Sequence, residues 1–283
     1  MIRLAIRCRP ELAEQALAEL VELAPSGVEE RSGEGWVEYA VYGPPGEIPE
    51  LPHLKAAVGD ALLDLYTEQV EDDWAERWRE FHKPVITSDR RLRVRPPWIE
   101  AAAGPGGVDG VEIEIVIEPG RAFGTGAHAT TRLCLDLLCE LAGAGLKARV
   151  ADLGTGSGVL AIAAARLKIG PVFGCDNDPA AVAIARQNAL ANRVEVEFAR
   201  LDLRSARPPE ADLWVANLTA PILRPLAAWL DRDDPTAPAP SRLILSGVLQ
   251  REAESVGAVY RAAGYRLQTI RSDGEWAALA MVR

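Results

Sequence analysis

From residue 148 onward, apolar runs typical of strands alternate with helical stretches. Strands are expected at residues 148–154, 171–176, 194–202, 211–218 and 241–248. Helices are expected at residues 158–168, 179–191, 221–230 and 250–263. Such regular alternation favours parallel strands joined by helical crossovers. The second part of the chain is therefore predicted to be an α/β, doubly wound Rossmann-like domain around a parallel sheet.

A different order of elements is expected in the first 70 residues. "MIRLAIRC" alternates like a strand, and "GVEERSGEGWVEYAVYG" has the pattern of two strands around a turn. With two helical stretches and a last strand, the order is βαββαβ, which is typical of a small α+β ferredoxin-like sandwich. Trp74 and Trp78 share one helical face, and Pro84 follows. We therefore divide the chain into a domain at 1–70, a helical linker at 71–84 and a domain at 85–283.

Charge and cysteine usage restrict the partners. The formal net charge is −10, and residues 1–70 hold five Lys or Arg against thirteen Asp or Glu. This balance disfavours direct nucleic-acid binding and suits a basic protein partner. The four cysteines form no CxxC pair and no metal-ligand spacing, as expected of reduced thiols in a cytoplasmic protein without a metal. No apolar run is long enough for a membrane span, and we expect a monomer.

The run "VADLGTGSGVLAIAAARL" combines a strand, a glycine turn and a helix. Read from Gly156, it satisfies a dinucleotide fingerprint, so the glycines alone do not choose the nucleotide. Asp152, however, immediately precedes the turn and would repel a pyrophosphate. S-adenosylmethionine instead brings a cationic amine and a sulfonium. We therefore predict S-adenosylmethionine as the cofactor, with Asp152, Gly154 and Gly156 in its site.

Three further strand ends carry polar side chains. Asp176 ends the strand after the glycine turn, where a carboxylate can accept hydrogen bonds from both ribose hydroxyls. Asp202 ends the next strand and is placed to meet the adenine amino group; a solvated surface acid is the alternative. Asn217 ends the fourth strand, where its carbonyl can orient an incoming amine toward the methyl group. Asn217 is therefore predicted to be catalytic as well as cofactor-binding.

Several runs, in order, carry a family resemblance: "EPGRAFGTGAHATTRLCL", "DLGTGSGVLAIAA", "CDNDP" and "VANL". With "DDWAERWREFHKP" and "GEWAALAMVR", they resemble the ribosomal protein L11 methyltransferase (PrmA) family. The resemblance covers nearly the whole chain and is weakest over residues 1–70. It implies S-adenosylmethionine-dependent methylation of lysines and an N-terminal amine of a basic ribosomal protein, which a small N-terminal domain presents.

The same resemblance implies that "PGRAFGTGAHATT" is a loop lying against the cofactor. Its glycines allow a close approach. Thr131 starts a helix and directs its hydroxyl at the methionyl end, while Phe123 shields the sulfonium. His128 is expected to make a local structural hydrogen bond rather than to act as a base. Thr131, Gly154, Asp176 and Asn217 match the cofactor-contacting positions of the family.

One departure from the family pattern keeps other functions open. Where relatives often have N-I-L-A, this chain has "NLTAPIL", so Thr219 and Pro221 change the acceptor side of the pocket. A methyltransferase of another protein or of a small amine would share the cofactor residues. A nucleic-acid methyltransferase, a NAD-dependent oxidoreductase and a non-catalytic binding module are weaker alternatives.

Overall fold

The computed structural model describes residues 2–13, 29–33, 35–43, 62–69, 83–101, 110–119, 128–230 and 239–283. The chain divides into two compact units, Met1–Phe81 and His82–Arg283. Most of the expected helical linker at 71–84 lies outside the described residues. Its helical form, and the three-part division of the chain, therefore stay predictions.

The first unit is built on a four-stranded antiparallel sheet. Its described elements are β1 (Ile2–Cys8), a short 3-10 helix (Pro10–Leu12), β2 (Glu29–Gly33), β3 (Trp36–Gly43) and β4 (Leu62–Gln69). The strand order is β2-β3-β1-β4, which is that of the ferredoxin-like sandwich expected from the sequence. The bodies of the two expected helices lie outside the described residues.

The two faces of this sheet differ in character because successive side chains of a strand alternate between them. One face is apolar, with Leu4 and Ile6 fully buried. The other face carries an ion network centred on Glu38. The Glu38 carboxylate accepts hydrogen bonds from Arg3 at 2.5 Å, Arg7 at 2.6 Å and the Tyr66 hydroxyl at 2.7 Å. Arg3 and Glu38 are both almost fully buried.

The second unit is built on a seven-stranded sheet of order β10-β9-β8-β11-β12-β14-β13. Its strands are β8 (Val150–Leu153), β9 (Val172–Asp176), β10 (Glu197–Arg200), β11 (Leu213–Asn217), β12 (Arg242–Leu249), β13 (Arg266–Asp273) and β14 (Trp276–Val282). Strands β8 to β12 pair in parallel, as expected. No strand was predicted after residue 248; there β13 and β14 add an antiparallel hairpin at one edge of the sheet.

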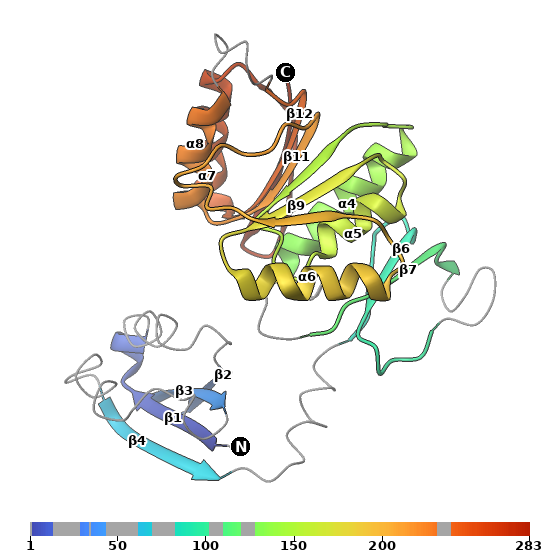
Figure 1. Ribbon diagram of the computed structural model, residues 1–283. Helices are drawn as coiled ribbons and strands as arrows, with labels where there is room; N and C mark the ends of the chain where they lie inside the picture. The colour runs from blue at the N-terminus through green and yellow to red at the C-terminus, as the bar shows by residue number, and fades with distance from the viewer. Residues whose placement is uncertain are drawn as a thin grey trace. The chain divides into compact units, whose positions relative to one another are not determined.

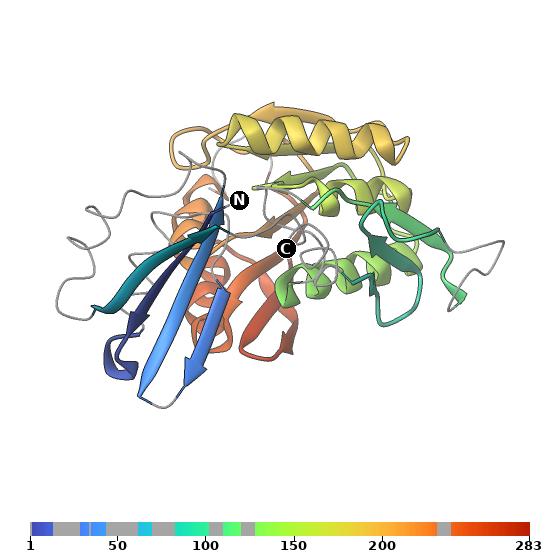
Figure 2. The same cartoon turned by 90° about the horizontal axis from the view of Figure 1, so that it is seen from below.

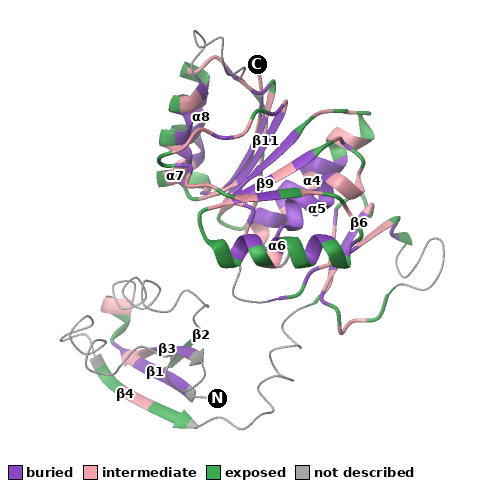
Figure 3. Ribbon diagram, in the orientation of Figure 1, coloured by how far each residue is buried: buried purple, intermediate pink, exposed green. Residues whose placement is uncertain are grey.

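Helices cover both faces of this sheet (Figure 1). The helices α4 (Ala129–Gly143), α5 (Val159–Arg166) and α6 (Pro179–Ala191) share one apolar core with the strands. On the other face, α7 (Ala220–Leu226), a 3-10 helix (Ala227–Leu230) and α8 (Gln250–Ala262) share a second core. Figure 3 shows buried residues along the strands and exposed residues on the outer sides of α6 and α8. The sheet is therefore covered on both faces, and its strand ends are left to form a site.

A smaller sheet precedes the doubly wound part of the unit. It contains β5 (Val85–Ile86), β6 (Leu92–Arg95) and β7 (Ile113–Val116), in that order. Figures 1 and 2 both place it beside α5, against which β7 packs. Within the described ranges, no helix is long and apolar enough to cross a bilayer.

Candidate functional site

The candidate site lies where the strand order of the large sheet reverses direction. Strand β8 is flanked by β9, which follows it in the chain, and by β11, which comes later. Ligands of doubly wound sheets bind outside the carboxyl ends of the strands at such a switch point. The glycine turn follows β8, Asp176 ends β9 and Asn217 ends β11. The fold thus brings the sequence-predicted residues of three strands to one edge of the sheet.

The glycine turn has a backbone that only glycine adopts readily. Gly154, Gly156 and Gly158 have φ values of 74°, 53° and 83°. The carbonyl of Cys175 on β9 accepts hydrogen bonds from the amides of Gly154 and Thr155, each at 2.8 Å. The turn is thereby tied to the neighbouring strand. Its glycines allow close packing, because a Cβ at Gly154 would clash with the Leu218 side chain and one at Gly158 would lie 3.0 Å from Ala185.

Asp152 braces this turn from inside the protein. It is 1% exposed, and its Oδ2 accepts hydrogen bonds from the Thr155 hydroxyl at 2.6 Å and the Ala161 amide at 3.1 Å. Burial, together with the nearby charge of Asp176, raises the pKa of Asp152 to about 6. Its Oδ1 is buried without a hydrogen-bond partner among the described residues. A direct contact with the cofactor, expected from the sequence, stays a prediction.

Asp176 and Asp202 differ in their hydrogen-bond partners. Asp176 is half-buried, and its oxygens accept hydrogen bonds from the amides of Gly156 at 2.9 Å and Asp178 at 3.1 Å. Each oxygen keeps further lone pairs for a ligand. Asp202 is held by Arg204 through two side-chain hydrogen bonds of 3.0 and 3.1 Å, which lower its pKa. The structure thus places Asp176 against the glycine turn, whereas Asp202 pairs with a surface arginine.

Asn217 and Thr131, 86 residues apart, meet at the end of β11. The Asn217 amide donates a hydrogen bond of 3.2 Å from Nδ2 to the Thr131 hydroxyl. Thr131 is fully buried, and its direct contact with the cofactor, expected from the sequence, stays a prediction. The Asn217 Oδ1 is buried and has no hydrogen-bond partner in the described part of the chain. A buried carbonyl without a donor is costly, so this oxygen marks a place where a ligand N–H is expected.

His128 takes the structural role expected for it. Its Nδ1 lies 2.8 Å from the Thr130 hydroxyl and accepts from the Thr130 amide, so it caps the start of α4. The Trp276 ring contacts it edge-on, with centroids 4.8 Å apart. Burial, and to a lesser extent the charge of Arg132, lowers the pKa of His128. Phe123 lies outside the described residues.

Gly247 also shapes the site, although it was not predicted from the sequence. Gly247 lies in β12 with a φ of 83°, at an irregularity in the pairing with β14. A Cβ there would lie 2.6 Å from the carbonyl oxygen of Leu218, the residue after Asn217. The signal was present in "LILSGVL", because a glycine inside a strand pattern often marks a bulge or a close backbone approach.

We expect Gly247→Ala to destabilise the second unit by about 2 kcal/mol, because it adds both a backbone clash and left-handed strain. The clash displaces Leu218, the residue after Asn217, so the methyl transfer predicted from the sequence should fall more than the loss of stability alone explains. Gly274→Ala is the matched control: its φ is 59°, and no described atom lies within 4 Å of the added carbon. Urea unfolding gives the free energy of unfolding of both variants, and Gly274→Ala reports the effect of strain without a clash. Equal losses of unfolding free energy in the two variants would contradict a clash at Gly247.

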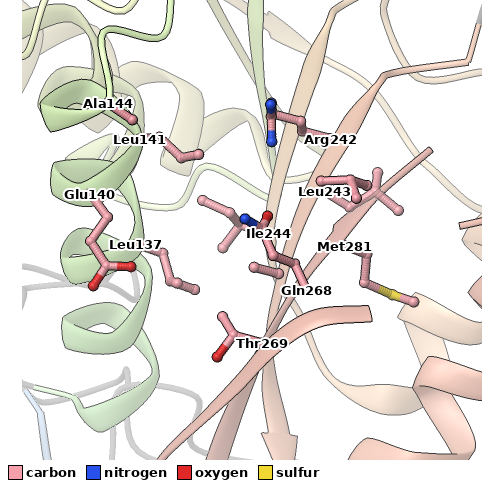
Figure 4. A pocket seen from close by; sticks show the side chains of 12 residues that line it. Leu137, Glu140, Leu141, Ala144, Arg242, Leu243, Ile244, Gln268, Thr269 and Met281 are labelled. Carbon is pink, nitrogen blue, oxygen red and sulfur yellow. The ribbon is translucent and has the colours of Figure 1, made fainter. Parts of the chain in front are cut away.

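A cavity elsewhere in this unit lies away from these residues. It has a volume of about 200 Å³ and lies between α4 and strands β12 to β14 (Figure 4). Arg242, the first residue of β12, lines it, as does Leu141 near the end of α4. The cavity is therefore at the amino end of β12, opposite the end that carries the glycine turn. None of the predicted site residues lines it.

Comparisons with known proteins identify the family of this chain. The family model "Ribosomal protein L11 methyltransferase (PrmA)" matches residues 51–283. The chain belongs to the PrmA family. A PrmA relative from Myxococcus xanthus is 35% identical over 290 residues, covering 97% of this chain and 96% of that protein. One from Heliobacterium modesticaldum is 41% identical over 222 residues, covering 77% of this chain and 66% of that protein.

A solved structure supports the same family. The crystal structure of a ribosomal protein L11 methylase from Lactobacillus delbrueckii subsp. bulgaricus has a TM-score of 0.60 and 30% identity. The match covers 71% of this chain and 99% of that one. The family resemblance and the fold class predicted from the sequence are thus confirmed, and the cofactor of this chain is S-adenosylmethionine. The Asn217 oxygen, which has no partner among the described residues, and the Asp176 carboxylate beside the glycine turn fit such a group.

Proposed function

We propose that this PrmA chain transfers methyl groups from S-adenosylmethionine to amino groups of ribosomal protein L11, at lysine side chains and an N-terminal amine. The observation that carries the proposal is the Asn217–Thr131 pair, which presents a buried carbonyl oxygen that has no hydrogen-bond partner among the described residues. Relatives named as ribosomal protein L11 methyltransferases support the choice of acceptor.

The cofactor, when bound, supplies a methyl group on a sulfonium whose thioether is the leaving group. Gly154, Gly156 and Asp176 would hold its adenosine part, with Asp202 in reach of the base and Phe123 covering the sulfonium. Asn217 accepts a hydrogen bond from the acceptor amine through Oδ1, which orients the nitrogen lone pair. Thr131 fixes the Asn217 amide so that this oxygen keeps its direction. The chain's contribution is therefore orientation and the exclusion of water.

The acceptor amine must be neutral before it reacts. For a lysine of pKa about 10.4, deprotonation at pH 7 costs about 4–5 kcal/mol, against about 1 kcal/mol for an α-amine. His128 is engaged in capping α4, and Asp152 is enclosed beneath the turn. We therefore propose that the proton goes to water, so that activity rises with pH between 7 and 9.

The acidic first unit suits this acceptor. Its charge balance of −8, from five basic and thirteen acidic residues in 1–70, would attract a basic ribosomal protein and steer its approach. We propose residues 1–70 as the recognition domain, joined by the linker at 71–84 to the methyltransferase domain at 85–283. The enzyme would act as a monomer in the cytoplasm, without direct contact to nucleic acid.

The test is methyl transfer from radiolabelled S-adenosylmethionine to purified ribosomal protein L11 of the same organism. We expect label on lysines or on the N-terminus, at a rate that increases from pH 7 to pH 9. Another basic ribosomal protein serves as the control and should stay unlabelled. If calorimetry shows that the cofactor binds but L11 carries no label, the chain would still be a methyltransferase, and the proposal that L11 is its acceptor would be wrong.

A further inference from the structure

Two buried asparagines, one in α6 and the other at its C-cap, join segments that are distant in sequence. Asn188 and Asn192 lie one helical turn apart and are 3% and 5% exposed. Asn192 binds the backbone of Val116 on β7 twice: Oδ1 accepts from the amide at 2.8 Å and Nδ2 donates to the carbonyl at 2.6 Å. Its amide thus pairs with β7 as another strand would. Asn192 fixes the distance between α6 and β7.

Asn188 instead reaches the glycine turn. Its Nδ2 donates a hydrogen bond of 2.8 Å to the carbonyl of Ser157, and its Oδ1 accepts one of 3.2 Å from the amide of Glu118. Ser157 lies between Gly156 and Gly158. Glu118 directly precedes Pro119, which opens the run "PGRAFGTGAHATT". One side-chain amide therefore spans the cofactor turn and the entrance to the run that the sequence places against the cofactor.

The turn needs such an external restraint. Its glycines at 154, 156 and 158 have positive φ values, and glycine leaves many alternative backbone conformations open. The Gly156 amide must stay aimed at Asp176, which it binds at 2.9 Å. A hydrogen bond to the carbonyl of Ser157 removes freedom from the middle of this turn. The bond to Ser157 joins two buried residues, so breaking it would leave buried polar groups unpaired. Glu118 is exposed, and the bond from its amide is longer, at 3.2 Å.

We propose that Asn188 is a positioning residue for the cofactor: it holds the glycine turn in its binding conformation and sets the distance of the turn from Glu118. The inference rests on the proposed function in one respect, since it takes the glycine turn as the S-adenosylmethionine site. Asn188 acts through Ser157 and Glu118 and does not itself contact the cofactor. Asn192 has the same chemistry and burial but no bond to the turn, which makes it a matched control.

The test compares Asn188→Asp with Asn192→Asp in the full chain. Aspartate keeps the size and the accepting oxygen of asparagine, but its second oxygen repels the carbonyl that Nδ2 had bound. Both variants should lower Tm by similar amounts. Only Asn188→Asp should weaken S-adenosylmethionine binding, by tenfold or more in calorimetric Kd at 25 °C. In the methylation assay, it should raise KM for the cofactor about tenfold and leave kcat within threefold.

Asn188→Ala and Asn192→Ala repeat the comparison without the repulsion, in case an aspartate variant does not fold. Equal cofactor Kd values for the two members of a pair would overturn the positioning role, whether or not both lose stability. Failure of the unaltered chain to bind S-adenosylmethionine would overturn the proposed function and this inference together. Failure to label ribosomal protein L11 with binding intact would overturn only the proposed acceptor.

Discussion

Asn217→Ala should reduce kcat for methyl transfer on the order of 100-fold, with a smaller rise in KM for the cofactor. The substitution removes the buried Oδ1 that is expected to orient the acceptor amine, and the hydrogen bond of Nδ2 to Thr131. Stopped-time assays at saturating cofactor and acceptor give the change in kcat directly. Calorimetry with S-adenosylmethionine separates the loss of orientation from a loss of cofactor binding.

Thr131→Val tests the same Asn217–Thr131 hydrogen bond with a smaller expected effect. Valine keeps the shape of threonine but leaves the Asn217 amide without its acceptor, while the catalytic oxygen remains. We expect about a tenfold loss of kcat, because an unsatisfied buried donor costs about 1–3 kcal/mol. If Asn217→Ala keeps kcat within tenfold of the unaltered protein, the orienting role of Asn217 is wrong. If Thr131→Val lowers kcat as much as Asn217→Ala does, the Thr131 hydroxyl contributes more to catalysis than a hydrogen bond to the Asn217 amide explains.

The second large effect is expected in the first unit. Glu38→Gln should destabilise that unit by about 3–5 kcal/mol, because it leaves Arg3 buried without its nearest counter-charge. Arg7 loses the same partner, which it binds at 2.6 Å. Hydrogen exchange of the β1 amides in the full chain reports the local free energy of unfolding. Glu30→Ala, at an exposed position of β2, should change it by less than about 0.5 kcal/mol.

The same carboxylate should make the first unit acid-sensitive. Burial by itself raises the pKa of Glu38, but hydrogen bonds from Tyr66, Arg3 and Arg7 outweigh it and lower the pKa to about 2. A pKa that is lower in the folded than in the unfolded state adds stability above the unfolded value, near 4.5. That contribution is lost as the pH falls from about 4.5 toward 2. If the first unit of Glu38→Gln loses stability over the same range of low pH as the unaltered protein, groups other than Glu38 cause the acid sensitivity.

Local sequence patterns predicted much of the fold. The five parallel strands and the four helices between and after them were expected from the alternation of apolar strand patterns with helical stretches. The antiparallel hairpin of β13 and β14 was not expected, although "SDGE" has the Asp-Gly signal of a tight turn. Strand direction at a sheet edge depends on how the chain returns to the sheet, which a periodic pattern does not encode.

By itself, then, the sequence determined the fold class, the glycine turn, the cofactor and the family, because each follows from residue types at short spacings. Only the tertiary structure decided which predicted polar groups face one another. In the folded chain, Asp152 is buried and accepts a hydrogen bond from Thr155. Asn217 is hydrogen-bonded to Thr131, 86 residues away, and Asn188 is hydrogen-bonded to Ser157. These contacts join separate elements of the fold, so their geometry depends on how helices and strands pack rather than on any local run.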